Sequence, residues 1–137
     1  MNSGLLEKAV ASALKIRENA YAPFSGFKVG AALITDDGEI YNGVNVENSS
    51  FGATVCAERN AIFSAVTAGR RRFSTIVIAS DLDGKAVYPC GICCQVMADF
   101  NPDMRIVLVN SGTGAVEQDC TLKEIFPQNF EFKGDKE

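Results

Sequence analysis

The residues of this chain that could do chemistry together are concentrated in two short stretches. TVCAERNA, at positions 54–61, holds Cys56 and Glu58, and YPCGIC, at positions 88–93, holds Cys90 and Cys93. Each stretch follows a loop and opens an apolar pattern that is typical of a helix. The N-terminal end of a helix carries partial positive charge, which favours thiolates and the ion that they bind.

The spacing of Cys90 and Cys93 places both sulfur atoms on one side of a helix's first turn, and C-x-x-C pairs of this type commonly hold zinc. The spacing alone is equally compatible with a thioredoxin-like redox pair, which would leave Cys56 and Glu58 without a role. Three protein ligands leave a tetrahedral zinc ion one open position, as in catalytic sites. The sequence therefore predicts that Cys56, Cys90 and Cys93 converge on a single zinc ion.

Glu58 is the natural proton carrier for such a site. A catalytic zinc ion lowers the pKa of its bound water towards about 7, and Glu58 stands near enough to Cys56 to reach that water without binding the metal. The chain contains no histidine, which excludes a histidine-triad hydrolase. The alternative is an acid that only complements the helix dipole, an effect worth about 0.3–1 kcal/mol.

Composition places the chain among ordinary globular proteins. Its 137 residues suit one domain spanning 1–137, with 47% hydrophobic and 22% charged residues. The net charge of −4 argues against a nucleic-acid partner, and no apolar run approaches the length of a membrane span. We expect a cytoplasmic protein, in which the five cysteines are thiols or metal ligands rather than disulfides.

Hydrophobic periodicity places the two stretches on elements of an α/β fold. Helices are predicted over about 3–19, 56–69, 91–100 and 122–126. A hairpin is predicted from residue 28 to 46 around a turn at 36–38, buried strands over 73–80 and 105–110, and an edge strand over 115–120. A hairpin followed by helix, strand, helix and strand predicts a mixed sheet with helices on its faces.

The combination of CAE at positions 56–58 with PCGIC at 89–93 resembles the zinc-dependent cytidine deaminases, in particular their short, homotetrameric type with three cysteine ligands. FKVGAAL at 27–33 and NVEN at 45–48 also resemble the substrate segments of that family. The likeness extends over nearly the whole chain. It implies a three-layer α/β fold with a mixed sheet of about five strands.

The resemblance also implies an activity. It is the hydrolytic deamination of cytidine and 2′-deoxycytidine to uridine and 2′-deoxyuridine, with release of ammonia, a step of pyrimidine salvage. Zinc-bound hydroxide would attack C4 while Glu58 moves the protons, with one zinc ion per subunit held by Cys56, Cys90 and Cys93. The expected partners are a nucleoside substrate and three further copies of the chain, with active sites shared between subunits and no nucleic acid or membrane.

Residue roles follow from the resemblance, position by position. Asn45 and Glu47 match the pair that hydrogen-bonds the ribose hydroxyls, and Phe27 matches an aromatic that packs at the base and sugar. Ala57 and Cys90 would contribute main-chain groups to the pyrimidine.

Two further matches concern charge and assembly. Phe130 matches a C-terminal aromatic that reaches a neighbouring subunit's site. Arg59 resembles an arginine that hydrogen-bonds the ligand sulfurs and offsets the excess charge of three thiolates on one divalent ion.

The chain departs from the family pattern where Cys94 replaces an arginine that usually follows the last ligand, and where Phe51 replaces a common tyrosine. Two alternatives stay open. A deaminase of another aminopyrimidine, such as blasticidin S, would keep the cysteines but not the ribose pair. A non-catalytic zinc domain would need a fourth protein ligand, for which only Cys94 or Cys120 remains among the cysteines. Nucleic-acid editing is disfavoured by the acidic charge.

Overall fold

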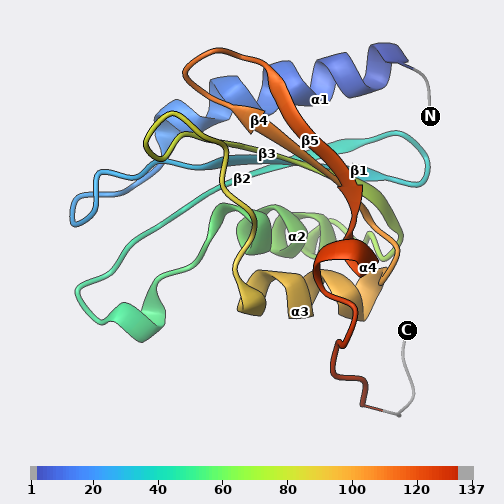
Figure 1. Cartoon of the computed structure of the whole chain (residues 1–137). Coiled ribbons are helices and arrows are strands. Elements are labelled where there is room, and N and C mark those ends of the chain that lie inside the picture. The colour runs from blue at the N-terminus through green and yellow to red at the C-terminus, as the bar shows by residue number, and fades with distance from the viewer. Residues whose placement is uncertain (1–2, 133–137) are drawn as a thin grey trace.

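A five-stranded mixed sheet forms the middle of the molecule (Figure 1). The computed structural model describes residues 3–132. The strands are β1 (Gly30–Thr35), β2 (Ile40–Val44), β3 (Phe73–Ser80), β4 (Arg105–Asn110) and β5 (Val116–Thr121), in the spatial order β2-β1-β3-β4-β5. β3 and β4 are parallel, and the other neighbouring pairs are antiparallel. The predicted mixed sheet is confirmed.

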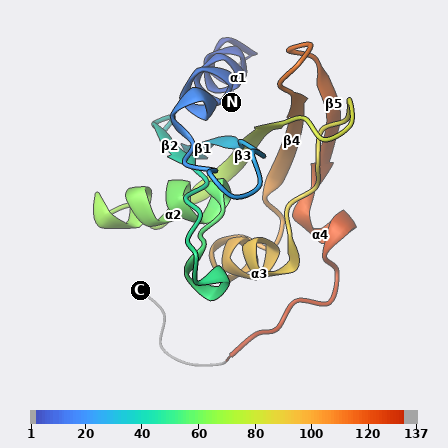
Figure 2. The same ribbon diagram turned by 90° about the vertical axis from the view of Figure 1, so that its left-hand side faces the viewer.

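Helices cover both faces of the sheet and complete three layers. α1 (Ser3–Ile16) crosses one face, while α2 (Ala57–Thr67) and α3 (Gly91–Phe100) lie side by side on the other, as Figures 1 and 2 show. α4 (Leu122–Ile125) follows β5. A short 3₁₀ turn at Arg17–Asn19 shortens the first predicted helix, and a second at Phe51–Ala53 lies in the segment between β2 and α2.

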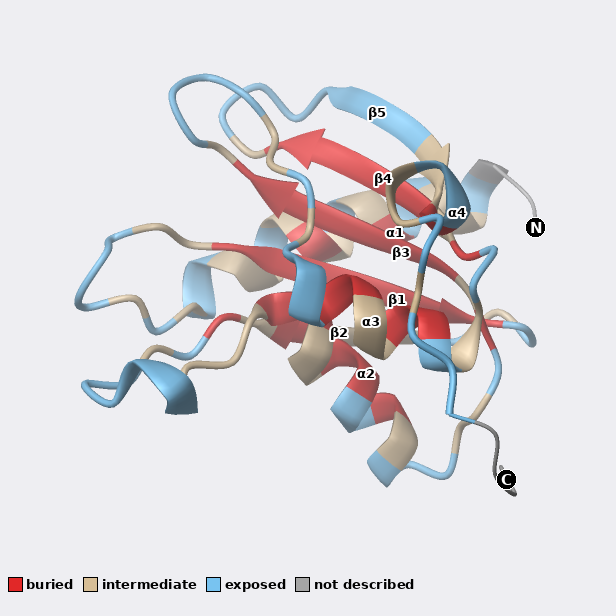
Figure 3. Ribbon diagram, turned by 60° about the horizontal axis from the view of Figure 1, so that its bottom comes forward, coloured by how far each residue is buried: buried red, intermediate tan, exposed pale blue. Residues whose placement is uncertain are grey.

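The two faces of the sheet belong to two separate hydrophobic clusters. Ala9 and Ala13 of α1 pack with Ala32 and Ile34 in one cluster, and the buried faces of α2 and α3 pack with the opposite face of the sheet in the other. In Figure 3 the central strands and the sheet-facing turns of both helices are buried, whereas β5 is largely exposed. This agrees with the prediction of buried strands at 73–80 and 105–110 and an edge strand after them.

β1, the first strand of the predicted hairpin, is a core strand. All six of its residues are buried. β1 lies between β2 and β3, and α1 packs on the side opposite α2. Ala32 and Ile34, on the second face, are therefore also core residues.

The fold brings the N-terminal ends of α2 and α3 together. α2 connects β2 to β3, and α3 connects β3 to β4, as expected for a crossover between parallel strands. The predicted helix at 91–100 is confirmed at both ends, and α2 starts one residue after Cys56. Within residues 3–132, no helix has the length and apolar character needed to cross a membrane.

Candidate metal centre and active site

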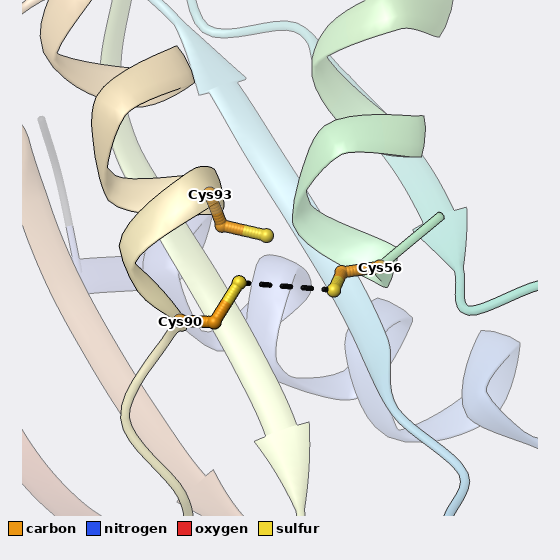
Figure 4. Close-up of side chains that lie close together, drawn as sticks. All are labelled: Cys56, Cys90 and Cys93. Atoms are coloured by element: carbon orange, nitrogen blue, oxygen red, sulfur yellow. Dashed lines mark hydrogen bonds between the residues drawn. The ribbon is translucent and has the colours of Figure 1, made fainter. Parts of the chain in front are cut away.

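Three cysteine side chains meet where α2 and α3 begin (Figure 4). Cys56 is the N-cap residue of α2, Cys90 is the N-cap residue of α3, and Cys93 lies in the first turn of α3. The Sγ atoms of Cys56 and Cys90 are 4.0 Å apart, and all three sulfur atoms lie within 4.8 Å of one another. The sequence-based prediction that these three residues converge is confirmed.

This triangle of sulfur atoms fits a zinc ion. Zinc–sulfur bonds of about 2.3 Å in a tetrahedron separate two ligand sulfurs by about 3.8 Å. The observed 4.0 Å between Cys56 and Cys90 is close to that separation. The donor set is all thiol, which zinc accepts readily, and the N-terminal ends of two helices favour the thiolate form. The three thiols are therefore placed to bind a zinc ion through three protein ligands.

The electrostatics of the cluster favour thiolate at Cys56. A hydrogen bond from the Cys93 thiol, followed by the Arg59 guanidinium, lowers the pKa of Cys56 to about 5, although burial opposes this. The same hydrogen bond, together with burial, raises the pKa of Cys93. Arg59 donates from Nη2 to the Cys56 sulfur at 3.5 Å. Arg59 thus lies where it can offset the excess negative charge of three thiolates.

Glu58 lies beside the cysteines with its carboxyl group shielded from solvent. It is 5% exposed, in the first turn of α2. Burial raises the pKa of Glu58 to about 7, the nearby Cys56 thiolate adds to this, and its own backbone N–H opposes it. A carboxyl group with this pKa exists in both protonation states at neutral pH, which suits a general acid and base.

Cys56, Cys90 and Glu58 line one cavity of about 250 Å³. Most of its walls come from β-strand ends and from the loops that precede α2 and α3. The lining residues are Phe27, Val29, Asn45, Glu47, Thr54, Cys56, Ala57, Glu58, Ile78, Ser80, Val87, Tyr88 and Cys90. A more open hollow of about 440 Å³ adjoins it through Glu47 and Thr54 but has no thiol in its lining. The chemistry therefore belongs to the smaller cavity.

Asn45 lies on the cavity wall just after β2 and is buried. Its Nδ2 donates to the Phe27 carbonyl at 2.7 Å, and its Oδ1 accepts from the Val29 N–H at 2.9 Å. These bonds fix the side chain against the segment that carries Phe27. One amide hydrogen and one lone pair of Asn45 remain beyond these two contacts.

Glu47 holds the loop that precedes β1. Its Oε1 accepts from the N–H groups of Phe24 and Ser25 at 2.9 and 3.1 Å, and its Oε2 accepts from the Ser25 hydroxyl. The Ser25 hydroxyl, followed by these backbone groups, lowers the pKa of Glu47 below its ordinary value. Glu47 is therefore an anionic acceptor at the cavity edge, oriented by three donors.

Phe130 is placed differently from the other predicted site residues. It is 69% exposed and lies outside the lining of the cavity. Its backbone is held to α3 by Gln95, whose Nε2 donates to the Phe130 carbonyl at 2.8 Å and whose Oε1 accepts the Phe130 N–H at 3.0 Å. The ring is thus not part of the cavity that Cys56, Cys90 and Glu58 line.

The sequence reasoning missed Ser25 and Tyr88, which contact Glu47 and line the cavity respectively. Ser25 stands in the turn-forming segment at 23–26, and Tyr88 directly precedes Pro89 and the first ligand of α3. The turn-forming segment and the position before Pro89 are both visible in the sequence, but each is equally typical of an ordinary loop.

Cys94 and Cys120 are not part of the metal cluster formed by described residues. Cys94 is buried, its thiol points to the Pro89 carbonyl at 3.7 Å, and burial raises its pKa to about 11. A rotation of about 100° per residue separates it from Cys93 on the helix. The cluster therefore supplies three thiols and not the four of a closed structural zinc site.

A three-layer α/β fold, a three-thiol zinc site and a buried acid beside it define a zinc-dependent enzyme of catalytic type. The sequence pattern of the cytidine and deoxycytidylate deaminase zinc-binding region matches residues 4–110. The chain belongs to this deaminase family.

Individual relatives agree with this membership. A cytidine deaminase of Sporosarcina psychrophila is 45% identical over 126 residues, covering 91% of this chain and 90% of that protein. The crystal structure of cytidine deaminase from Burkholderia pseudomallei matches with a TM-score of 0.85 and 41% identity, over 95% of this chain and all of that chain. A blasticidin-S deaminase of Bacillus cereus is less similar, at 35% identity over 109 residues, covering 74% of this chain and 76% of that protein.

Proposed function

We propose that the protein is a zinc-dependent cytidine deaminase that hydrolyses cytidine and 2′-deoxycytidine to uridine and 2′-deoxyuridine and releases ammonia. The observation that carries this proposal is the buried Glu58 carboxyl group beside the three-thiol cluster, in a cavity whose other wall holds Asn45 and Glu47. The cytidine deaminases that this chain resembles, at 45% and 41% identity, support the substrate.

The metal ligands in this proposal are Cys56, Cys90 and Cys93. When bound there, zinc supplies a water molecule of lowered pKa as the nucleophile for C4 of the cytosine ring. Arg59 contributes its positive charge next to the Cys56 sulfur. That charge counteracts the electron donation of three thiolates, which would otherwise weaken the acidity of the water.

Glu58 carries protons in both halves of the reaction. It takes one proton from the attacking water and delivers it to N3 of the ring, which relieves the negative charge that addition at C4 creates. It then moves the proton of the new C4 hydroxyl to the exocyclic amine, so that the C4–N bond breaks, ammonia leaves and the C4=O bond forms. The oxygen retained at C4 gives the uracil ring. Burial raises the pKa of the Glu58 carboxyl group in the metal-free protein, which supports its role as a group that both takes up and releases a proton.

The remaining cavity residues bind the nucleoside in this scheme. Asn45 and Glu47 hydrogen-bond the ribose hydroxyls, using the amide hydrogen and the carboxylate lone pairs left by their loop contacts. Phe27 packs against base and sugar. Main-chain groups of Ala57 and Cys90 bind the pyrimidine. The ribose pair is also the reason to prefer cytidine over blasticidin S.

Assembly and cellular role extend the proposal. The chain acts as one catalytic domain in a homotetramer, with Phe130 reaching a neighbouring subunit's site, and it serves pyrimidine salvage. Exposed Phe130, held by Gln95 outside its own cavity, supports the shared site. The five free cysteines support action in the cytoplasm, where thiols stay reduced and available to zinc.

An absorbance assay with cytidine tests the activity. The purified protein is expected to contain one zinc ion per subunit and to lower the absorbance of the cytosine band as uridine forms. Glu58→Ala should lose roughly 10²–10⁴-fold in kcat, the usual contribution of general acid–base catalysis, and keep its zinc.

Two outcomes would count against the proposal. Full activity in zinc-loaded Glu58→Ala would exclude the proton-transfer role. A zinc-loaded wild-type protein that ignores both nucleosides but deaminates blasticidin S would move the assignment to that class.

A further inference from the structure

The loop between β3 and α3, residues 81–90, delivers one ligand and a wall of the active site. Val87, Tyr88 and Cys90 all line the cavity. The first part of the loop turns back on itself between Leu82 and Lys85, whose backbones exchange hydrogen bonds of 2.9 and 3.2 Å. From there the chain runs to Cys90 without regular secondary structure. The position of the Cys90 sulfur therefore depends on what holds this loop.

Asn110, at the end of β4, is one of the groups that hold it. The residue is 2% exposed, and its side chain makes four hydrogen bonds. Its Oδ1 accepts from the N–H groups of Gly112 and Thr113 at 2.8 and 3.3 Å. Its Nδ2 donates to the Gly84 carbonyl at 2.8 Å and to Glu117 Oε2 at 2.9 Å. A buried amide with every capacity used fixes its neighbours strongly.

Glu117, on the exposed edge strand β5, takes the next contact along the loop. Its Oε1 accepts the Ala86 N–H at 2.7 Å, while its Oε2 accepts from Asn110. The Ala86 N–H, followed by Asn110, lowers the pKa of Glu117 below its ordinary value. At the following residue, the Ser80 hydroxyl accepts the Val87 N–H at 2.9 Å. Side-chain hydrogen bonds thus hold the loop at Gly84, Ala86 and Val87, just before Tyr88 and Cys90.

We propose that Asn110 and Glu117 are positioning residues of the metal site. Neither touches the metal ligands. Together they fix Gly84 and Ala86 against the β4–β5 end of the sheet. The Cys90 sulfur is thereby held close enough to those of Cys56 and Cys93 for all three to bind one zinc ion. The inference rests on the zinc site of the proposed function and not on the identity of its substrate.

The donor and acceptor pattern makes this proposal specific. Glu117 must accept two hydrogen bonds, so Glu117→Gln, which offers one oxygen and one NH₂ group, has to lose either the Ala86 or the Asn110 contact. Asn110→Asp keeps the oxygen facing Gly112 and Thr113 but turns a second oxygen towards the Gly84 carbonyl and the Glu117 carboxylate. In the double variant, the NH₂ group that Glu117→Gln introduces can donate to the new carboxylate at position 110, so that contact is restored.

Zinc affinity and backbone hydrogen exchange test the proposal without using activity. Glu117→Gln and Asn110→Asp should raise the zinc dissociation constant about tenfold, the lower end of the effect of outer partners on a metal site. Exchange of the Ala86 and Val87 N–H groups should quicken in the zinc-loaded protein. The double variant should bind zinc more tightly than Asn110→Asp alone.

Asp119→Asn is the matched control. Asp119 lies two residues from Glu117 on β5 and pairs with Arg105 at 2.9 and 2.6 Å, away from the loop. The zinc affinity of the Asp119→Asn variant, and the hydrogen exchange of its Ala86 and Val87 N–H groups, should equal those of the wild type. A purely structural role would lower the free energy of unfolding in all variants but leave the metal affinity of the folded protein unchanged.

Equal zinc dissociation constants for Glu117→Gln and Asp119→Asn would overturn the proposal. The exposed position of Glu117 keeps this comparison available even where Asn110→Asp fails to fold. Zinc is measured in the absence of any nucleoside, so failure here leaves the deaminase assignment untouched. Conversely, inactivity towards cytidine leaves the positioning role untouched.

Discussion

At the scale of single residues, Glu58 is held in a state that costs stability. Its carboxyl group is buried beside a thiolate, and both surroundings disfavour its charged form. The N-terminal end of α2 and Arg59 offset only part of this cost, since its pKa remains at about 7. Zinc, as a divalent cation in the same cavity, would favour the charged carboxylate. The cost is therefore largest in the metal-free protein.

A stability measurement on the metal-free protein tests this. The folded-state pKa of about 7 lies above the ordinary 4.5, so between these pH values the Glu58 carboxyl group binds more protons in the folded state than in the unfolded chain. The contribution of Glu58 to the free energy of unfolding therefore falls as pH rises through this window. The shift corresponds to about 3 kcal/mol above pH 7. Metal-free Glu58→Gln should exceed the wild type by up to that amount at pH 8 and match it near pH 4.5.

Urea unfolding with a chelator and a reductant gives the comparison. Glu7→Gln, on the exposed side of α1, serves as the control because it removes one acid without removing a buried charge. A Glu58→Gln variant that is no more stable than the wild type at pH 8 would show that burial does not raise the pKa of Glu58 in this way.

The roles of single residues were readable from the sequence only where they depend on local spacing. Cys90 and Cys93 share a helix turn, so their common direction follows from the helical period. The clamp of Ser25 on Glu47 and that of Asn110 on Gly84 join segments 22 and 26 residues apart. No local pattern fixes such pairs, because they depend on the register of the folded sheet.

At the scale of elements, two glycines let helices dock closely on opposite faces of the β1–β2 hairpin. A Cβ atom on Gly43 would lie 2.3 Å from the Ala61 nitrogen and 2.4 Å from the Ala57 carbonyl oxygen of α2. A Cβ atom on Gly30 would lie 2.3 Å from the Ala13 carbonyl oxygen of α1. The obstructing atoms are backbone, so a whole helix would have to move.

Alanine at these two positions should destabilise the fold in both variants but impair zinc binding and catalysis in only one of them. Gly43→Ala and Gly30→Ala should each lower the free energy of unfolding by about 1–3 kcal/mol or more, the usual cost of overpacking. Only Gly43→Ala displaces α2, which carries Glu58 and follows Cys56, so only this variant should also weaken zinc binding and lower kcat/KM. Wild-type zinc affinity and kcat/KM in folded Gly43→Ala would contradict the importance of this contact.

The elements themselves were largely predictable, and the reason is physical. β3 and β4 each contain a continuous apolar run, and α3 lies between Pro89 and the Asn101-Pro102 pair; the predicted limits of all three agree with the structure. The hairpin that contains β1 was predicted, but the burial of both faces of β1 was not. It depends on the position of α1, which is 14 residues long and separated from β1 by a loop.

At the scale of the whole molecule, large aromatic side chains remain exposed. Phe51 is 82% exposed, Phe130 69%, Phe132 73% and Phe24 58%. Phe24 and Phe51 line the open hollow beside the active-site cavity, whereas Phe130 lines neither this hollow nor that cavity. Phe130 is moreover fixed by two hydrogen bonds of Gln95 to its backbone. A residue whose backbone is held while its ring stays exposed is suited to contact a neighbouring subunit.

Mixing two defective variants tests whether sites are shared in the proposed homotetramer. Glu58→Ala lacks the proton carrier but keeps Phe130, and Phe130→Ala keeps Glu58 but lacks the ring. If Phe130 completes a neighbour's site, co-assembly of equal amounts gives wild-type residues at about a quarter of the sites, because each residue comes from an independently chosen subunit. Activity should then exceed the sum of the separately assembled variants. If the ring serves its own subunit, no mixed site holds both residues, and the mixture should show only that sum.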